Sequence, residues 1–286
     1  MLCAAMLALT GGCAGRPELP IIELSSGSAA ALTATRLDAL LPTDVLLIGE
    51  QHDAKEHQQI EQQVITQLAE RGLLAAVALE MAEVGTSTAR LKPSSTDEQA
   101  RRALKWDNKD WPWAAYGPAV MTAVRAGVPV LGANLPRSQL ADRMTDHQLD
   151  SRLPGPALKA QQQAIRIGHC GLLPESQVTP MTRAQIARDI TMADTLHQLA
   201  LPGKVVVLLA GSGHADRHLG VPQHLPTDLQ VKAVRLQAGG NANANASANA
   251  VDADAFDSVW ATPAVPAIDY CADAKAQFAP SPARPN

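Results

Sequence analysis

Two short segments of the chain place a histidine just after an apolar run. In the first, the apolar residues 45–48 lead directly into Gly49-Glu50-Gln51-His52-Asp53. In the second, the apolar residues 205–210 lead into Gly211-Ser212-Gly213-His214. A short apolar run bounded by a turn signal is typical of a strand buried on both faces. Because open α/β sheets carry functional groups at the carboxyl ends of their strands, the two histidines are expected to share one cleft.

Other polar residues follow predicted strands and are expected at the same edge. The full candidate set consists of Glu50, His52, Glu80, Asn134 and His214. Two imidazoles and two carboxylates could bind a transition metal or serve as acid and base. The alternative is that the histidines only cap turns at the sheet edge. His57 and His218, which lie a few residues beyond the two motifs, are interpreted as ordinary surface histidines.

A second polar group lies on a predicted long helix over residues 182–201. Gln185, Arg188 and Asp189, with Met192 one turn further, share one face of this helix. Arg188 could pair with a strand-end carboxylate and hold the cleft closed. The alternative is an ion pair on the helix surface.

Tyrosine is rare in this chain, with only Tyr116 and Tyr270 present. Tyr116 lies in the apolar, aromatic segment Trp111-Pro112-Trp113-Ala114-Ala115-Tyr116-Gly117-Pro118. A phenolate is one of the axial ligands that proteins offer to ferric haem, and aromatic walls would suit a flat macrocycle. The alternative is a tyrosine buried in the hydrophobic core.

The order of apolar runs and amphipathic segments predicts an α/β fold. A helical pattern over 54–71 separates the first apolar run from a second at 73–79, which indicates a right-handed, parallel βαβ unit. We therefore predict a mostly parallel sheet flanked by helices, built from residues 33–134 and 204–262. No strand is predicted within 135–203, so these residues are expected to form a smaller all-helical subdomain. Residues 263–286 are interpreted as a tail, and the Asn/Ala repeat at 239–250 as a disordered loop.

Composition narrows the class of partner. The 286 residues carry a net charge of −4, which gives no basic surface for binding nucleic acid.

Residues 1–12 are apolar, too short to span a bilayer, and end in small residues before Cys13. This pattern predicts a lipoprotein signal peptide, lipidation of Cys13 and a tether over 13–32, with an ordinary signal peptide as the alternative. Ala14 after the cysteine favours the outer membrane of a Gram-negative bacterium.

Two cysteines remain after Cys3 leaves with the signal and Cys13 takes the lipid. In an oxidising compartment Cys170 and Cys271 are expected to form a disulfide, with two buried thiols as the alternative. Closing a loop of about 100 residues would be worth up to ~4–5 kcal/mol by chain entropy.

Many short motifs from about residue 43 to 225 together resemble the ChaN family of haem-binding lipoproteins. This family belongs to a wider group with Tiki proteases, TraB proteins and erythromycin esterases. The motifs are Leu47-Ile48-Gly49-Glu50-Gln51-His52-Asp53, Glu80-Met81, Trp111-Pro112-Trp113 with Tyr116 and Pro118, Asn134-Leu135-Pro136-Arg137, His169-Cys170-Gly171, Gln185 with Arg188-Asp189 and Met192-Ala193, Ala210-Gly211-Ser212-Gly213-His214, and Gly220-Val221-Pro222.

The resemblance implies a cofacial pair of haems bound across a homodimer. One tyrosine from each protomer would ligate iron, and a histidine of the other protomer would hydrogen-bond the propionates. Tyr116 is then the candidate iron ligand, and His169 is preferred over His147 and His197 as the propionate partner. If the family's ligand instead falls in the helical subdomain, this chain has no tyrosine there.

Three hypotheses follow. The first is an outer-membrane lipoprotein that binds haem for iron uptake without turnover, in partnership with a haem or iron receptor. The second is a hydrolase, metal-dependent or metal-free, that uses Glu50 and Glu80 as bases and His52 and His214 as ligands or proton carriers. The third is a structural lipoprotein with a vestigial cleft.

Overall fold

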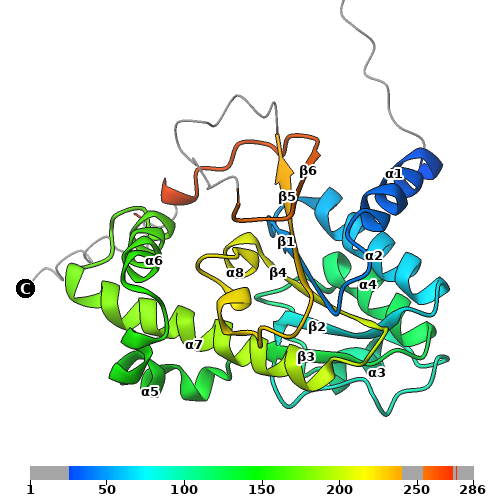
Figure 1. The fold of residues 1–286 in the computed structure, drawn as a ribbon, viewed down its shortest axis with the longest axis horizontal. Coiled ribbons are helices and arrows are strands. Elements are labelled where there is room, and N and C mark those ends of the chain that lie inside the picture. The colour runs from blue at the N-terminus through cyan, green and yellow to red at the C-terminus, as the bar shows by residue number, and fades with distance from the viewer. Residues whose placement is uncertain (1–25, 240–253, 273–274, 276–286) are drawn as a thin grey trace, which may run out of the picture.

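The computed structural model describes residues 26–239, 254–272 and 275, and its centre is a six-stranded sheet with all strands parallel (Figure 1). The strand order is β3-β2-β4-β1-β5-β6. The strands are β1 (Val45–Glu50), β2 (Leu74–Glu83), β3 (Val130–Asn134), β4 (Val205–Gly211), β5 (Val231–Ala238) and β6 (Ser258–Thr262). The predicted α/β fold with a mostly parallel sheet is confirmed.

Helices cover both faces of this sheet, which explains the unbroken apolar runs. Alternate strand residues such as Leu46 and Ile48 pack toward α1 (Ser26–Asp38), α2 (Lys55–Glu70), α3 (Asp97–Ala103) and α4 (Trp113–Arg125). The residues between them, such as Val45 and Leu47, pack toward α7 (Glu175–Leu199) and α8 (Ser212–Ala215). Every residue of β1 is buried, as expected for a central parallel strand.

The described elements between β3 and β4 are all helical. They are η1 (Arg137–Gln139), α5 (Leu140–Thr145), η2 (His147–Ser151), α6 (Gly155–Gly168) and α7, and η3 (Val221–His224) follows β4. Leu135, Leu149 and Ile186 belong to a small core of their own. The far half of α7 leaves this core and packs on the sheet through Met192 and Leu196. The long helix therefore links the helical region to the sheet.

Two predicted boundaries are wrong. Helix α1 begins at Ser26, inside the predicted tether over 13–32. Helix α7 begins at Glu175 rather than at Thr182, and it continues through Pro180, which lies inside the helix. The predicted signal peptide, Cys13 and nearly all of the Asn/Ala repeat lie outside the described residues. No helix in the described part of the chain is long and apolar enough to cross a bilayer.

A disulfide joins Cys170, just after α6, to Cys271 near the C-terminus. The Cα atoms lie 5.6 Å apart, and 101 residues separate the two cysteines in sequence. The C-terminal segment, orange to red in Figure 1, runs from β6 toward the end of α6. The pairing is the one expected from the sequence.

Candidate functional site

The carboxyl ends of β1, β2 and β4 bring the predicted strand-end residues together. Strand β4 lies between β1 and β2, and Glu50 is in register with Gly211. A Cβ atom on Gly211 would lie 2.9 Å from His52 Nε2, so the histidine packs where a side chain would otherwise be. The two Gly-x-x-His motifs therefore meet at one edge because the strands that carry them are neighbours.

At this edge, carboxylates and imidazoles alternate in a continuous line. His214 is buried between Asp189 of α7, whose Oδ1 lies 2.5 Å from His214 Nδ1, and Glu80, whose Oε1 lies 3.4 Å from His214 Nε2. The other Glu80 oxygen lies 3.9 Å from His52 Nε2 and accepts the Gly211 N–H at 2.7 Å. His52 Nδ1 donates to Glu50 Oε1 at 2.8 Å. We call these five side chains the strand-end network.

The network holds a positive charge on its buried histidine. Burial opposes the charged imidazolium, but the neighbouring carboxylates of Glu80 and Asp189 outweigh it and raise the pKa of His214 to about 10. Burial alone would raise the pKa of Glu80, whereas His214 and His52 lower it to about 2. At neutral pH the structure therefore contains a buried imidazolium paired with an ionised Glu80.

His52 is the member of the network that solvent reaches. Its side chain is 40% exposed and lies against Trp111, with ring centroids 4.8 Å apart. Burial lowers its pKa, but the hydrogen bond to Glu50 and the charge of Glu80 outweigh burial, and the net pKa is raised. His52 could therefore exchange a proton with a bound molecule.

Tyr116 lies in the core rather than in an open haem site. Its side chain is 1% exposed, and its hydroxyl donates to Glu50 Oε1 at 2.7 Å. Burial and the adjacent carboxylate of Glu50 raise the pKa of this phenol far above its usual value. The aromatic segment around it packs on the ring, with Trp111 and Trp106 near Tyr116. The geometry does not fit a haem-iron ligand.

Two predictions about neighbouring side chains are wrong. His57 is fully buried, where Nδ1 accepts the Gln51 N–H at 2.9 Å and Nε2 lies 2.9 Å from the Thr262 hydroxyl. His218, in contrast, is exposed as expected. The predicted pairing of Arg188 with a strand-end carboxylate is absent, since no ion pair within the described residues involves Arg188.

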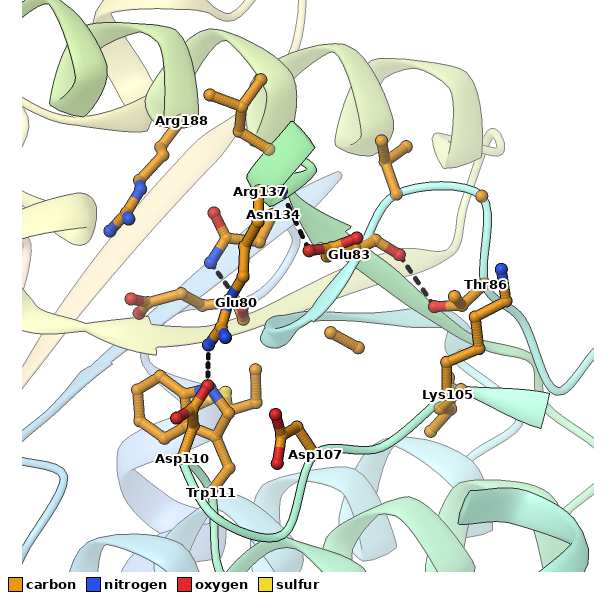
Figure 2. A pocket seen from close by; sticks show the side chains of 16 residues that line it. Glu80, Glu83, Thr86, Lys105, Asp107, Asp110, Trp111, Asn134, Arg137 and Arg188 are labelled. Carbon is orange, nitrogen blue, oxygen red and sulfur yellow. Dashed lines mark hydrogen bonds and ion pairs between the residues drawn. The ribbon is translucent and has the colours of Figure 1, made fainter. Parts of the chain in front are cut away.

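A pocket of about 520 Å³ opens beside the network (Figure 2). Glu80 and Asn134 form part of its wall, and Asn134 Nδ2 donates to the Glu80 carbonyl at 2.8 Å. Figure 2 shows the Arg188 side chain extending from α7 toward Glu80. The pocket also contains Asp110, which pairs with Arg137. Its lining therefore mixes charges of both signs next to one ionised carboxylate.

Sequence reasoning missed two members of the site on α2. Gln58 Nε2 donates to Glu50 Oε2, and Glu61, one turn further, is fully buried near Glu50. Burial and the charge of Glu50 raise the pKa of Glu61 well above its usual value. The signal was available, because both polar residues fall on the same helical face as Val64 and Ile65.

His169 and Tyr270 directly precede the two cysteines of the disulfide and are not members of the strand-end network. His169 is partly exposed, and its Nδ1 donates to the Ile165 carbonyl at 2.8 Å. Tyr270 is 55% exposed, and its hydroxyl donates to Asp53. The other two histidines considered for propionates are His147, which contacts Arg183, and the exposed His197. Within the described residues, no three or more His, Cys, Asp or Glu side chains form a group that could hold a metal ion.

A family model and one solved structure point to the same family. Residues 36–225 match a family described as haem-binding uptake, Tiki superfamily, ChaN. Among solved structures, the cofacial haem complex of ChaN from Campylobacter jejuni is 27% identical, with a TM-score of 0.61 over 72% of this chain and 86% of that one. The type III effector HopBA1 is 14% identical, with a TM-score of 0.42 over 75% of this chain and 83% of that one. No curated protein matches the sequence.

Proposed function

Because this chain belongs to the ChaN family of haem-binding uptake proteins in the Tiki superfamily, we propose that it binds haem and takes part in haem uptake. The observation that carries the proposal is the family match over residues 36–225. The likeness to a ChaN structure with cofacial haems supports it, because that likeness covers most of both chains.

We further propose that haem is bound through a tyrosine at a homodimer interface. Ferric haem accepts a phenolate as an axial ligand, and the chain holds only two tyrosines. His169 is the proposed partner for a haem propionate. Since a carbonyl can only accept, His169 Nδ1 carries the proton of its bond to Ile165, and Nε2 must be protonated to donate to a carboxylate.

The proposed location is the outer membrane of a Gram-negative bacterium. The apolar residues 1–12 followed by Cys13 support a lipid anchor, and Ala14 supports sorting to the outer membrane. The anchored protein would receive haem from, or deliver it to, an outer-membrane haem or iron receptor.

A hemin titration of the purified full chain tests the central proposal. Absorbance is expected to change from the spectrum of hemin in buffer to that of a ferric haem with a tyrosinate ligand. Light scattering after size exclusion is expected to show more dimer as hemin is added. An unchanged hemin spectrum at saturating protein would contradict haem binding, and binding to a protein that stays monomeric would contradict the shared interface.

A second candidate function is metal-free hydrolysis at the strand-end network. The observation that favours it is the partly exposed His52, held between Glu50 and Glu80 beside the pocket. In this reaction His52 would take a proton from water, the resulting hydroxide would attack an acyl carbon, and the proton would pass to the departing alkoxide.

Ester hydrolysis by a His52→Gln variant tests this second function. Loss of a general base is expected to lower kcat by about 10²–10⁴-fold, whereas His218→Gln, at an exposed histidine, should leave it unchanged. The rate should rise with pH through a value above the ordinary histidine pKa, because the pKa of His52 is raised and the base must be neutral. Equal rates in His52→Gln and the native chain would rule out this role. Elemental analysis of protein purified without chelators distinguishes the metal-dependent from the metal-free hydrolase. A protein without bound transition metal would leave only the metal-free reaction.

A further inference from the structure

The two arms of the disulfide carry similar sequences. One arm reads Ile167-Gly168-His169-Cys170, and the other reads Ile268-Asp269-Tyr270-Cys271. Each arm has an isoleucine three residues before its cysteine and a residue able to ligate haem iron directly before it. With the cysteine Cα atoms 5.6 Å apart, the disulfide brings these two arms together. We call Ile167, His169, Ile268 and Tyr270 the disulfide patch.

Three side chains of the disulfide patch are more than half exposed. Ile167 is 66% exposed, Ile268 is 52% exposed and Tyr270 is 55% exposed. The disulfide holds the two arms that carry these side chains next to each other, and contiguous exposed apolar surface is typical of binding sites. A haem presents two wide apolar faces and an iron at its centre, so it matches a surface that combines isoleucines with a phenol and an imidazole.

The ligand groups of the patch are accessible, unlike Tyr116. The Tyr270 hydroxyl lies at the surface, where its only described hydrogen bond is to the exposed Asp53. This bond raises the pKa of the Tyr270 phenol, so the phenol keeps its proton until a stronger partner replaces Asp53. On binding iron, Tyr270 would give up that proton, and Asp53 is the carboxylate in position to receive it.

The disulfide is what fixes Tyr270 in this place. Between β6 and Cys271 nearly all residues are exposed, so side-chain burial does little to hold this segment. The covalent link to Cys170 therefore supplies most of the constraint. Breaking it would separate Tyr270 from His169 while leaving the sheet and its core intact.

We propose that Tyr270 ligates haem iron and that the Cys170–Cys271 disulfide holds it beside His169, so that haem binding requires the oxidised protein. This inference rests on the proposed haem-binding function and names the residues that perform it. It replaces Tyr116 with Tyr270 as the ligand.

Four full-length proteins test the inference by hemin titration with absorbance and electron paramagnetic resonance. They are the native chain, Tyr270→Phe, Tyr116→Phe and the double variant Cys170→Ser/Cys271→Ser. Tyr270→Phe is expected to lose the tyrosinate signature and to weaken binding at least about tenfold. The double serine variant should lose the same signature although it retains Tyr270. Tyr116→Phe should retain it. Serine variants are used because a chemical reductant would also reduce ferric iron.

The outcomes separate this inference from the proposed function. If the native chain binds no hemin, both the proposed function and the inference about Tyr270 are contradicted. If the native chain binds and Tyr270→Phe gives the same spectrum and Kd, the inference is overturned and haem binding stands. Full binding by the double serine variant would overturn the role of the disulfide. Because Tyr270 is exposed and phenylalanine keeps its ring, circular dichroism should show an unchanged fold in that variant.

Discussion

Replacing His214 by alanine is expected to lower the free energy of unfolding by about 3–5 kcal/mol near pH 7. The imidazolium lies between the buried carboxylates of Glu80 and Asp189, and both would lose their cationic partner at once. Urea denaturation of the purified protein measures the change. The matched control is His218→Ala, an exposed histidine four residues further on, which should change stability by less than about 0.5 kcal/mol.

The pH dependence of this loss follows from the direction of each pKa shift. The pKa of His214 is raised to about 10, so its stabilisation is complete below its unfolded value of 6.5 and disappears as pH rises through about 10. The pKa of Glu80 is lowered to about 2, so its contribution is present above 4.5 and is lost as pH falls through about 2. Burial raises the pKa of Asp189 to about 6, so its pairing with His214 weakens as pH falls below that value. The difference between the native chain and His214→Ala should therefore be largest near pH 6.5 and should shrink toward pH 10. A difference that does not change with pH would show that His214 acts by packing alone.

The sequence was sufficient to predict that the two Gly-x-x-His motifs share a site. Both motifs follow fully apolar runs, and such runs form central parallel strands whose ends meet at one edge. The strand order was beyond sequence reasoning, because β4 inserts between β1 and β2 from more than a hundred residues away. That insertion places Glu80 between His52 and His214 and turns separate candidates into a continuous network.

His57 and Tyr116 were both interpreted from the sequence around them, and both make contacts with distant parts of the chain. His57 was interpreted as a surface residue, whereas it is buried and its Nε2 lies 2.9 Å from the hydroxyl of Thr262, 205 residues later on β6. Tyr116 looked like a ligand because its segment is aromatic, but its hydroxyl is directed to Glu50 on β1, 66 residues away. For His57 the local pattern was informative, because this residue lies one turn before Glu61 on the buried face of α2. For Tyr116 a long-range hydrogen bond decides the environment, and the local pattern carries no information about it. The position of Tyr270 is set in the same way by a covalent bond to the middle of the chain.

Replacing Glu61 by methionine is expected to raise the free energy of unfolding by about 1–3 kcal/mol near pH 7. Glu61 is fully buried on α2, and neither of its carboxyl oxygens has a hydrogen-bond partner within the described residues. An apolar side chain of similar size removes the cost of burying this group. Urea denaturation measures the gain, and Glu70→Met, at an exposed position of the same helix, should change stability by less than about 0.5 kcal/mol.

The gain from Glu61→Met should grow with pH. Burial and the charge of Glu50 raise the pKa of Glu61, so the folded chain holds this proton more tightly than the unfolded chain. Stability conferred by the native residue therefore falls as pH rises above its ordinary value of 4.5, and the methionine variant escapes this fall. A larger gain at pH 8 than at pH 4 is the expected result. If Glu61→Met instead destabilises the protein at both pH values, the packing of the Glu61 side chain outweighs the cost of burying its carboxyl group.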